Sequence, residues 1–248
     1  MIPSLAHISI ILVEPQSPGN IGMVCRAMAN FGCGDLRLVN PCQHLHAEAR
    51  KFAVAANHLL GEARLFPDLA AAVSDLTLSV ATTRRSGRLR GELLDITEVP
   101  ALQQNLPPQG RFGLVFGRED SGLTSEEVSL CSHAATIETS ATLGSLNLAQ
   151  AVILFLYEMA RTPKPTSSTA TSPHLSQGDL EELFGQVESI LTRTAFLNPS
   201  RPDAVMHRIR QLTHRAGLSA EDHALLRGIC SQLSWSLRDW KGRKRGSN

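Results

Sequence analysis

The chain has 248 residues, of which 42% are hydrophobic and 19% charged, so it can bury a sizeable core and is not disordered. Its formal net charge is only +1, which excludes a strongly basic field over the whole protein. The charge is uneven, because residues 1–162 carry 12 Lys and Arg against 15 Asp and Glu, whereas residues 163–248 carry 12 against 8. A basic tail on a mildly acidic body is a weak indication of a polyanionic partner.

The five cysteines are odd in number and widely spaced, with no CxxC pair. This usage favours a reducing compartment and argues against a structural zinc site. The apolar run at residues 8–13 is too short for a membrane span, and no signal-peptide pattern precedes it. We therefore expect a cytoplasmic protein without a membrane anchor and without a bound metal.

Short apolar runs alternate with helical patterns along residues 1–162. We expect strands at residues 7–13, 35–39, 76–81, 112–116 and 134–138, and helices at residues 20–31, 46–60, 67–74, 124–131 and 147–161. Asn20 is a candidate N-cap of the first helix, and Thr124 with Glu127 forms a capping box. The alternation predicts an α/β domain with a mostly parallel sheet and helices on both faces.

The helix expected at residues 147–161 is apolar on almost every face, so it should be buried against the sheet or against a second subunit. Residues 163–174, rich in Pro, Ser and Thr, predict an extended linker. Beyond it, apolar residues recur at helical spacing, and helix-start patterns occur at residues 200–203 and at Ser219 with Asp222. Residues 175–248 should therefore form a small all-helical domain.

Three loops carry the residue types that chemistry needs. The first, EPQSPGNIGMVCRAMANFG, is a turn rich in Pro and Gly that leads into a helix bearing Arg26. The second, LVFGREDSGLTSEE, places Gly117 and Glu119 after a strand, where glycine lets a ligand approach the backbone closely. The third, IETSATLGSLN, ends at Asn147 just before the apolar helix.

Each loop taken alone has a plain structural interpretation as well. Arg26 can be a surface arginine in a salt bridge near a helix start. Glu119 can be a catalytic acid or a carboxylate that orders its loop, and Asn147 is a natural helix cap. The glycine spacing in the second loop is not G-x-G-x-x-G, so a dinucleotide site is poorly supported.

Taken together and in this order, the loops resemble the three motifs of the SpoU branch of the SPOUT RNA methyltransferases. The matching elements are N-x-x-x-x-x-R after the first strand, FGxExxGL after a later strand, and SLN at the start of the last apolar helix. The opening HISIILVEPQSPGNIGMVCRAM, the strand end LSVATTRR and the tail run LLRGICSQL are similar to family members that 2′-O-methylate the tRNA anticodon loop. The resemblance therefore covers nearly the whole chain.

The resemblance implies a C-terminal trefoil knot in the α/β domain, a homodimer whose active site is shared between subunits, and S-adenosylmethionine as cofactor. The cofactor-binding positions that it implies, mostly through main-chain groups, are Thr82, Thr83, Arg84, Gly117, Ile137, Gly144, Ser145 and Leu146. Family members often carry a serine where this chain has Gly144. The expected reaction is 2′-O-methylation of tRNA at position 32, on cytidine, uridine or both. Ribosomal RNA, another tRNA position and a non-catalytic RNA-binding role are the alternatives.

Arg26 matches the motif-one arginine to which the family assigns activation of the ribose hydroxyl. Because the pKa of arginine lies above about 12, it is a poor base at neutral pH. We therefore expect Arg26 to bind a phosphate and to stabilise the developing alkoxide, with direct proton abstraction as a secondary possibility. The residues that the resemblance assigns to positioning Arg26 and the ribose are Asn20, Glu119, Ser145 and Asn147.

Cationic side chains are expected to bind tRNA phosphates. One group follows the third strand and another lies in the tail: Arg84, Arg85, Arg88, Arg90, Arg208, Arg210, Arg215 and the basic run 241–245. A solvated loop is the alternative for the first group. Aromatic residues make up only 4% of the chain, which favours recognition of shape and backbone over base stacking.

Overall fold

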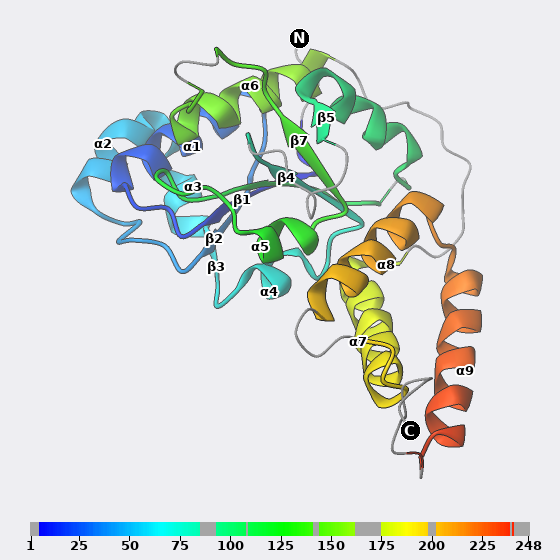
Figure 1. Cartoon of the computed structure of the whole chain (residues 1–248). Coiled ribbons are helices and arrows are strands. Elements are labelled where there is room, and N and C mark those ends of the chain that lie inside the picture. The colour runs from blue at the N-terminus through cyan, green and yellow to red at the C-terminus, as the bar shows by residue number, and fades with distance from the viewer. Residues whose placement is uncertain are drawn as a thin grey trace. The chain divides into compact units, whose positions relative to one another are not determined.

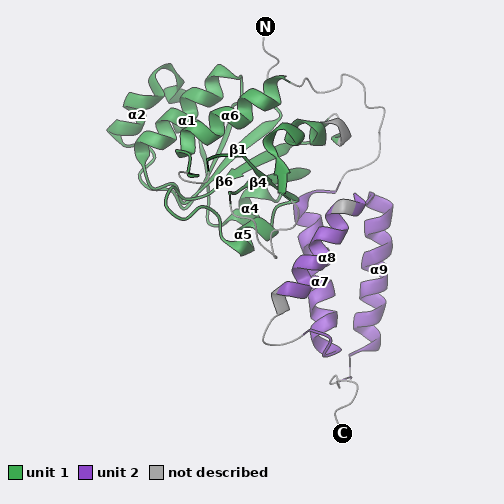
Figure 2. Ribbon diagram, turned by 45° about the horizontal axis from the view of Figure 1, so that its top comes forward, with its two compact units in different colours: residues 1–170 green, residues 171–248 purple. Residues whose placement is uncertain are grey.

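The computed structural model describes residues 5–84, 93–107, 109–140, 144–161, 175–197, 202–238 and 240. The chain forms two compact units, residues 1–170 and residues 171–248, which Figure 2 colours separately. The linker expected at residues 163–174 lies outside the described residues. Within the described ranges, no helix combines the length and the apolar character that a membrane crossing needs.

The first unit is built on a seven-stranded sheet with the order β3-β2-β1-β6-β4-β7-β5 (Figure 1). Its strands are β1 (Ile8–Val13), β2 (Asp35–Val39), β3 (Arg64–Phe66), β4 (Leu78–Thr82), β5 (Leu93–Asp95), β6 (Phe112–Phe116) and β7 (His133–Thr136). All the described pairings are parallel, which confirms the predicted sheet. The carboxyl ends of all these strands therefore lie along one edge.

Helices cover both faces of this sheet, as predicted. The elements are α1 (Pro18–Asn30), α2 (Ala47–Ala53), η1 (Val54–Ala56), α3 (Asn57–Glu62), α4 (Leu69–Val73), η2 (Ile96–Asn105), α5 (Ser125–Ser129) and α6 (Leu148–Arg161). Ile10 and Leu12 of β1 pack with α1 and α6, whereas Ile11 and Val13 point to the other face and pack with α4 and α5. Figure 1 shows α4 and α5 on the side of the sheet away from α1 and α6. Successive side chains of β1 thus belong alternately to two separate hydrophobic cores, one on each face of the sheet.

Several boundaries differ from the prediction. The first helix begins at Pro18, and its N-cap is Ser17, whose side chain accepts a hydrogen bond from the backbone N–H of Asn20. The prediction of Asn20 as the cap was therefore wrong, because Pro18 occupies a first-turn position that proline favours. The single helix expected at residues 46–60 is broken into α2, η1 and α3 at Val54, where φ is +53°.

The apolar helix α6 is only half covered within one chain. Val152, Phe155 and Leu156 are buried against the sheet core, which confirms that part of the prediction. On the outer face Ile153, Leu154 and Tyr157 remain 39%, 40% and 51% exposed.

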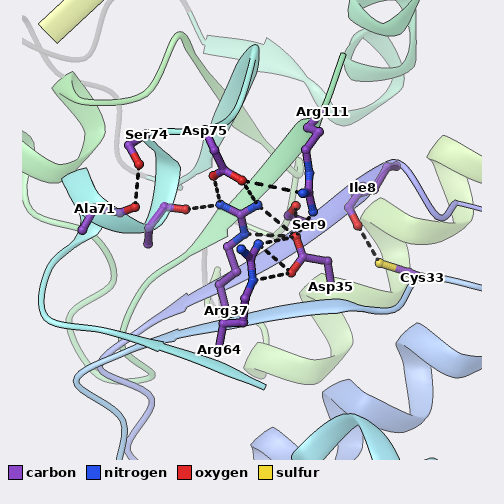
Figure 3. Close-up of polar contacts among 11 residues, drawn as sticks. Ile8, Ser9, Cys33, Asp35, Arg37, Arg64, Ala71, Ser74, Asp75 and Arg111 are labelled. Carbon is purple, nitrogen blue, oxygen red and sulfur yellow. Dashed lines mark hydrogen bonds and ion pairs between the residues drawn. The ribbon is translucent and has the colours of Figure 1, made fainter. Parts of the chain in front are cut away.

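The amino edge of the sheet holds a buried ion-pair cluster, shown in Figure 3. The side chain of Arg37 is fully buried. It donates from Nε to Asp35 Oδ2 at 3.0 Å, from Nη2 to Asp75 Oδ2 at 3.0 Å and from Nη1 to the carbonyl of Ala72 at 2.6 Å. Asp35 also accepts hydrogen bonds from Ser9, Arg64 and Arg111. The cluster therefore ties β1, β2 and β3 to the segments that precede β4 and β6.

The second unit consists of α7 (Gln177–Arg193), α8 (Pro202–Ala216) and α9 (Ala220–Ser236). Ser219 and Asp222 form the capping box at the start of α9, as the sequence predicted. α7 packs against α9 around Leu183 and Ile190, and against α8 around Phe184. These contacts confirm a small all-helical region built from amphipathic helices. The start of α8 was expected from residues 200–203, of which residues 200 and 201 lie outside the described residues.

Candidate active site at the carboxyl edge of the sheet

A pocket lies where the carboxyl ends of β4, β6 and β7 meet the beginning of α6. In parallel sheets, ligands commonly bind at this edge, because the loops after the strands converge there. The residues expected to bind the cofactor all line this one pocket: Thr82, Thr83, Arg84, Gly117, Ile137, Gly144, Ser145 and Leu146. Apolar side chains of Leu123 and Phe155 contribute to the same walls. The pocket therefore combines apolar surface with main-chain groups from loops far apart in the sequence.

Gly117 lets the loop after β6 fold back on itself. A Cβ at this position would lie 2.2 Å from the carbonyl carbon of Gly122 and 2.4 Å from the backbone nitrogen of Leu123. The fold-back is closed by two backbone hydrogen bonds between Arg118 and Gly122, at 2.9 and 3.3 Å. Any larger residue at position 117 would push this wall of the pocket out of place.

Gly144 makes room for Arg84 on another wall. A Cβ at Gly144 would lie 2.4 Å from Nη1 of Arg84 and 2.8 Å from its Cδ. The hydroxyl of Thr139 donates to the carbonyl of Gly144 at 3.2 Å and fixes the loop there. Arg84 therefore packs over Gly144, the position at which the resemblance led us to expect a serine in many relatives.

Three residues from the three loops form a continuous polar chain beside the pocket. Asn20 donates from Nδ2 to Glu119 Oε1 at 2.9 Å, and its own Oδ1 accepts from Asn147 Nδ2 at 2.9 Å. Asn147 also accepts from the backbone N–H of Ala149 at 2.9 Å and so caps α6, as the plain interpretation proposed. Asn20, 7% exposed, uses its donor and its acceptor at once. It therefore couples the loop after β6 to the start of α6.

The carboxylate of Glu119 is held by three N–H donors. Besides Asn20, the backbone N–H groups of Gln16 and Ser17 donate to it at 2.8 and 3.1 Å. Donors that converge from three sides fix the orientation of a carboxylate. This geometry supports the interpretation of Glu119 as a group that orders the loop, and both of its oxygens are engaged.

Arg26 does not join this group within one chain. It lies on α1, is exposed, and is not among the residues that line the pocket. Within the part of the chain that the structure describes, its guanidinium makes no hydrogen bond or ion pair. The alternative interpretation of Arg26 as a surface arginine in a salt bridge is therefore not supported. Ser145, expected to contact the cofactor and to help position the ribose, lines the pocket and is exposed; its role stays a prediction.

Comparison with known proteins agrees with this geometry. The model of the SpoU rRNA methylase family matches residues 7–157, and that of the C-terminal domain of the tRNA methyltransferase TrmJ matches residues 178–244. The chain belongs to the SpoU methylase family. Over 244 residues this SpoU-family chain is 33% identical to the tRNA (cytidine/uridine-2′-O-)-methyltransferase TrmJ of Cronobacter sakazakii, covering 95% of this chain and 99% of that protein.

Two further relatives cover most of the chain. The tRNA (cytidine/uridine/adenosine-2′-O-)-methyltransferase TrmJ of Pseudomonas aeruginosa is 34% identical over 241 residues, which cover 92% of this chain and 94% of that protein. The crystal structure of TrmJ from Z. mobilis ZM4 has a TM-score of 0.79 and 33% identity, and the match covers 91% of this chain and 98% of that one. The likeness therefore includes both units of this SpoU-family chain.

The arginines expected to bind RNA have different environments. Arg208 is exposed on α8. Arg210 instead forms an ion pair with Glu181, and its guanidinium carbon lies 4.7 Å from the centroid of the Phe184 ring, so it holds α8 on α7. The remaining positions lie outside the described residues or have side chains that are not described: Arg85, Arg88, Arg90, Arg215 and the run 241–245.

Some features of this SpoU-family site were not predicted from the sequence. The N–H donors of Gln16 and Ser17 are backbone groups, which leave no trace in residue identity. Arg118, next to Glu119, pairs with Glu14 and Glu127. The pattern that could have indicated this pairing is the arginine in the FGRE string, followed nine positions later by the capping glutamate Glu127.

Other reactive groups are unavailable or too scattered. Burial raises the pKa of the thiols of Cys25, Cys33 and Cys131 to about 12, so they stay protonated at neutral pH. Among the described residues, His, Cys, Asp and Glu side chains form no group of three that could hold a metal ion.

Proposed function

We propose that this SpoU-family protein transfers a methyl group from S-adenosylmethionine to the 2′-hydroxyl of a tRNA ribose at position 32, on cytidine, uridine or both. The observation that carries the proposal is the polar chain of Glu119, Asn20 and Asn147 beside a pocket walled by glycine-rich strand ends. Relatives named as tRNA 2′-O-methyltransferases at 33% and 34% identity support tRNA over ribosomal RNA as the substrate.

The pocket fits the proposed cofactor chemically. An adenine ring requires an apolar slot with main-chain hydrogen-bond partners at its edges, and Ile137, Leu146 and Phe155 border backbone groups here. The close fold-back at Gly117 brings main-chain groups to the pocket surface, where a side chain would otherwise fill the space. S-adenosylmethionine, when bound, supplies an electrophilic methyl group on its sulfonium.

Arg26 would act from the neighbouring subunit of a homodimer. Its exposure and its absence from the pocket of its own chain support this arrangement. The outer face of α6, with Ile153, Leu154 and Tyr157 exposed, supports an apolar subunit contact. Arg26 would bind the phosphate next to the target ribose and stabilise the alkoxide that develops on the 2′-oxygen. The same charge lowers the energy of the deprotonated oxygen, so the proton of the 2′-hydroxyl would pass to solvent water and Arg26 need not accept it.

The polar chain would orient the reacting groups. Asn20 and Glu119 fix the loop after β6, Asn147 fixes the start of α6, and Ser145 would contact the ribose. Aligning a nucleophile with its target can supply ~7–11 kcal/mol of the acceleration. Much of the catalysis is therefore assigned to positioning rather than to acid–base chemistry.

We also infer the finer organisation from the family. It comprises a SPOUT domain at residues 1–162 with a trefoil knot, a linker at 163–174 and a tRNA-binding helical domain at 175–248. The match of residues 178–244 to the TrmJ C-terminal domain supports the last of these. Among the arginines expected to bind RNA, Arg84 at the pocket and the exposed Arg208 on α8 would meet phosphates. A tRNA substrate supports a cytoplasmic location.

Methyl transfer to unmodified tRNA transcripts tests the proposal. Purified protein with methyl-labelled S-adenosylmethionine should label a transcript that has ribose at position 32. The matched control is the same transcript with a single 2′-deoxynucleotide at position 32, which should stay unlabelled. Label on the deoxy transcript would move the target to another position, and label on ribosomal RNA alone would contradict the tRNA assignment. Absence of label on any RNA would favour a non-catalytic RNA-binding role.

A further inference from the structure

We propose that Arg118 is a positioning residue of this site, which holds the loop at residues 117–123 in the shape that binds S-adenosylmethionine. The inference rests on the proposed function, because it concerns the affinity of the same pocket. Arg118 is not among the residues that the family motifs assign to the site. Its importance follows from what its guanidinium contacts.

Four hydrogen bonds connect the guanidinium of Arg118 to three parts of the chain. Nε donates to Glu14 Oε2 at 2.8 Å, in the turn that follows β1. Nη1 and Nη2 donate to the two oxygens of Glu127 on α5, each at 3.0 Å. Nη1 also donates to the carbonyl of Gly122 at 3.3 Å, within the loop itself. The side chains of Arg118 and Glu127 are each 16% exposed, so their contact is largely shielded from water, whereas the side chain of Glu14 is 45% exposed.

Arg118 and Glu119 attach the same loop to the same neighbouring segment at two points. Arg118 contacts Glu14, whereas Glu119 accepts from the backbone of Gln16 and Ser17. A loop held at one point can still pivot, whereas two successive contacts fix its orientation. The placement of Glu119, and with it the wall of the pocket, therefore depends on the contact that Arg118 makes.

The carboxylate of Glu127 and the backbone of Glu14 are each fixed independently of Arg118. Glu127 belongs to the capping box of α5, where its Oε2 accepts from the backbone N–H of Thr124 at 2.8 Å. Glu14 has φ of +46°, and its backbone N–H donates to the carbonyl of Val39 at 2.8 Å. Pre-oriented acceptors lower the entropy cost of ordering a long arginine side chain against them.

The role requires arginine rather than any cation. The planar fork of the guanidinium reaches Glu127 with two parallel N–H bonds while Nε remains free to reach Glu14. A lysine carries the same charge but only one nitrogen, which cannot span both carboxylates and the carbonyl of Gly122.

Arg118 is also unsuited to bind RNA or cofactor directly through its charge. Its single positive charge faces two carboxylates, so the group of three carries a net charge of −1. Hydrogen bonding to Glu14 and to Glu127 raises the pKa of Arg118, so it stays charged in these pairs. A phosphate would have to displace those partners. Arg118 therefore acts through the loop.

Calorimetric binding of S-adenosylhomocysteine to the full-length protein tests this role without requiring turnover. Arg118→Ala and Arg118→Lys should both weaken binding by about tenfold or more, and should raise the KM for S-adenosylmethionine while kcat at saturation changes by less than about threefold. Arg64→Ala is the matched control, because Arg64 also pairs with a carboxylate, at 2.9 Å from Asp35, and does not line the pocket. It should bind the ligand as the unsubstituted protein does.

Several outcomes would overturn the role. Unchanged binding in Arg118→Ala, full rescue by Arg118→Lys, or a large fall in kcat with unchanged KM would each contradict positioning through the loop. Glu14→Gln removes the charge of one partner, at a side chain that is 45% exposed, while keeping an oxygen that can accept from Arg118. It should weaken binding by about two- to fivefold even where Arg118→Ala fails to fold. Failure of the unsubstituted protein to bind S-adenosylhomocysteine would instead contradict the proposed function itself.

Discussion

The two edges of the sheet use polar residues in opposite ways. At the amino edge, Arg37 is buried between Asp35 and Asp75, and the positive side chain pairs with the two negative ones. At the carboxyl edge, glycines bring backbone groups to the surface of a pocket, and the polar chain centred on Asn20 runs beside it. The amino edge is therefore closed by side-chain ion pairs, whereas the carboxyl edge leaves hydrogen-bonding groups for a ligand. Changes at the first should affect folding, and changes at the second should affect binding and turnover.

The largest effect is expected from Arg37→Met. Removing the buried cation leaves Asp35 and Asp75 without their central partner, and breaking such a pair from one side typically costs about 3–5 kcal/mol. Urea unfolding should show this loss in the free energy of unfolding. Arg64→Ala, whose side chain is 42% exposed, should cost less than about 1 kcal/mol. Equal losses in the two variants would contradict a special role for the buried member.

In the proposed homodimer, Arg26 serves the pocket at the carboxyl edge of the neighbouring subunit. Arg26→Ala should therefore reduce turnover by about 100-fold or more, because a positioned charge near a developing oxyanion is worth that much. Cofactor affinity and the free energy of unfolding should stay close to those of the unsubstituted protein, because Arg26 is exposed and lies outside the pocket. Methyl transfer assays and calorimetry measure the two quantities. Retained turnover would remove Arg26 from the mechanism.

Mixed dimers would test whether Arg26 acts in the site of the neighbouring subunit of the proposed homodimer. Gly117→Ala should abolish cofactor binding, because its Cβ would meet the backbone of Gly122. A dimer of this variant with Arg26→Ala contains one site that combines an intact pocket with an intact Arg26 from the other subunit. Co-expressing the two inactive variants should therefore restore about a quarter of the normal activity, since half of the dimers are mixed and each has one working site. No restoration would show that each subunit uses its own arginine.

The amino-edge cluster should also respond to acid. Burial raises the pKa of Asp35, but hydrogen bonds from Ser9 and Arg37 and the charges of Arg37 and Arg64 outweigh this effect, so the net pKa is lowered; Asp75 is lowered similarly. Because the folded pKa lies below the unfolded value, these carboxylates contribute stability above the ordinary pKa of 3.8, and it is lost as pH falls through the folded pKa. Urea midpoints measured between pH 6 and about pH 3 should therefore fall less steeply in Asp75→Asn. Identical slopes would contradict this assignment.

The smallest effect is expected from Gly144→Ser, which introduces the residue that family members often carry. Its Cβ must displace the end of Arg84, a flexible side chain that can move at low cost. The KM for S-adenosylmethionine should change by about two- to fivefold, with little change in the free energy of unfolding. Steady-state kinetics on tRNA would measure it, and a complete loss of activity would show that Arg84 is fixed in place.

The sequence predicted the carboxyl edge of the sheet better than the amino edge. Apolar runs such as the one at residues 8–13 predicted the parallel sheet, and the three motif loops pointed to residues that the fold brings to one pocket. The strands β3 and β5 were missed, because three residues are too few for a periodic pattern. Arg37 sits in the apolar run DLRLV, and nothing local indicates that it pairs with Asp75, which lies 38 residues away. Pairings of this kind depend on tertiary structure, whereas motif spacing does not.

The polar chain through Asn20 has a consequence for the order in which the protein becomes competent. Its members are made at very different times, because Glu119 follows Asn20 by 99 residues and Asn147 follows it by 127. A chain still emerging from the ribosome holds Asn20 long before its last partner exists, and it also lacks the wall of the pocket that α6 supplies. Tight cofactor binding is thereby reserved for chains whose synthesis has passed the final helix of the domain. We therefore expect chains that end before α6 to bind S-adenosylmethionine more weakly than the finished domain.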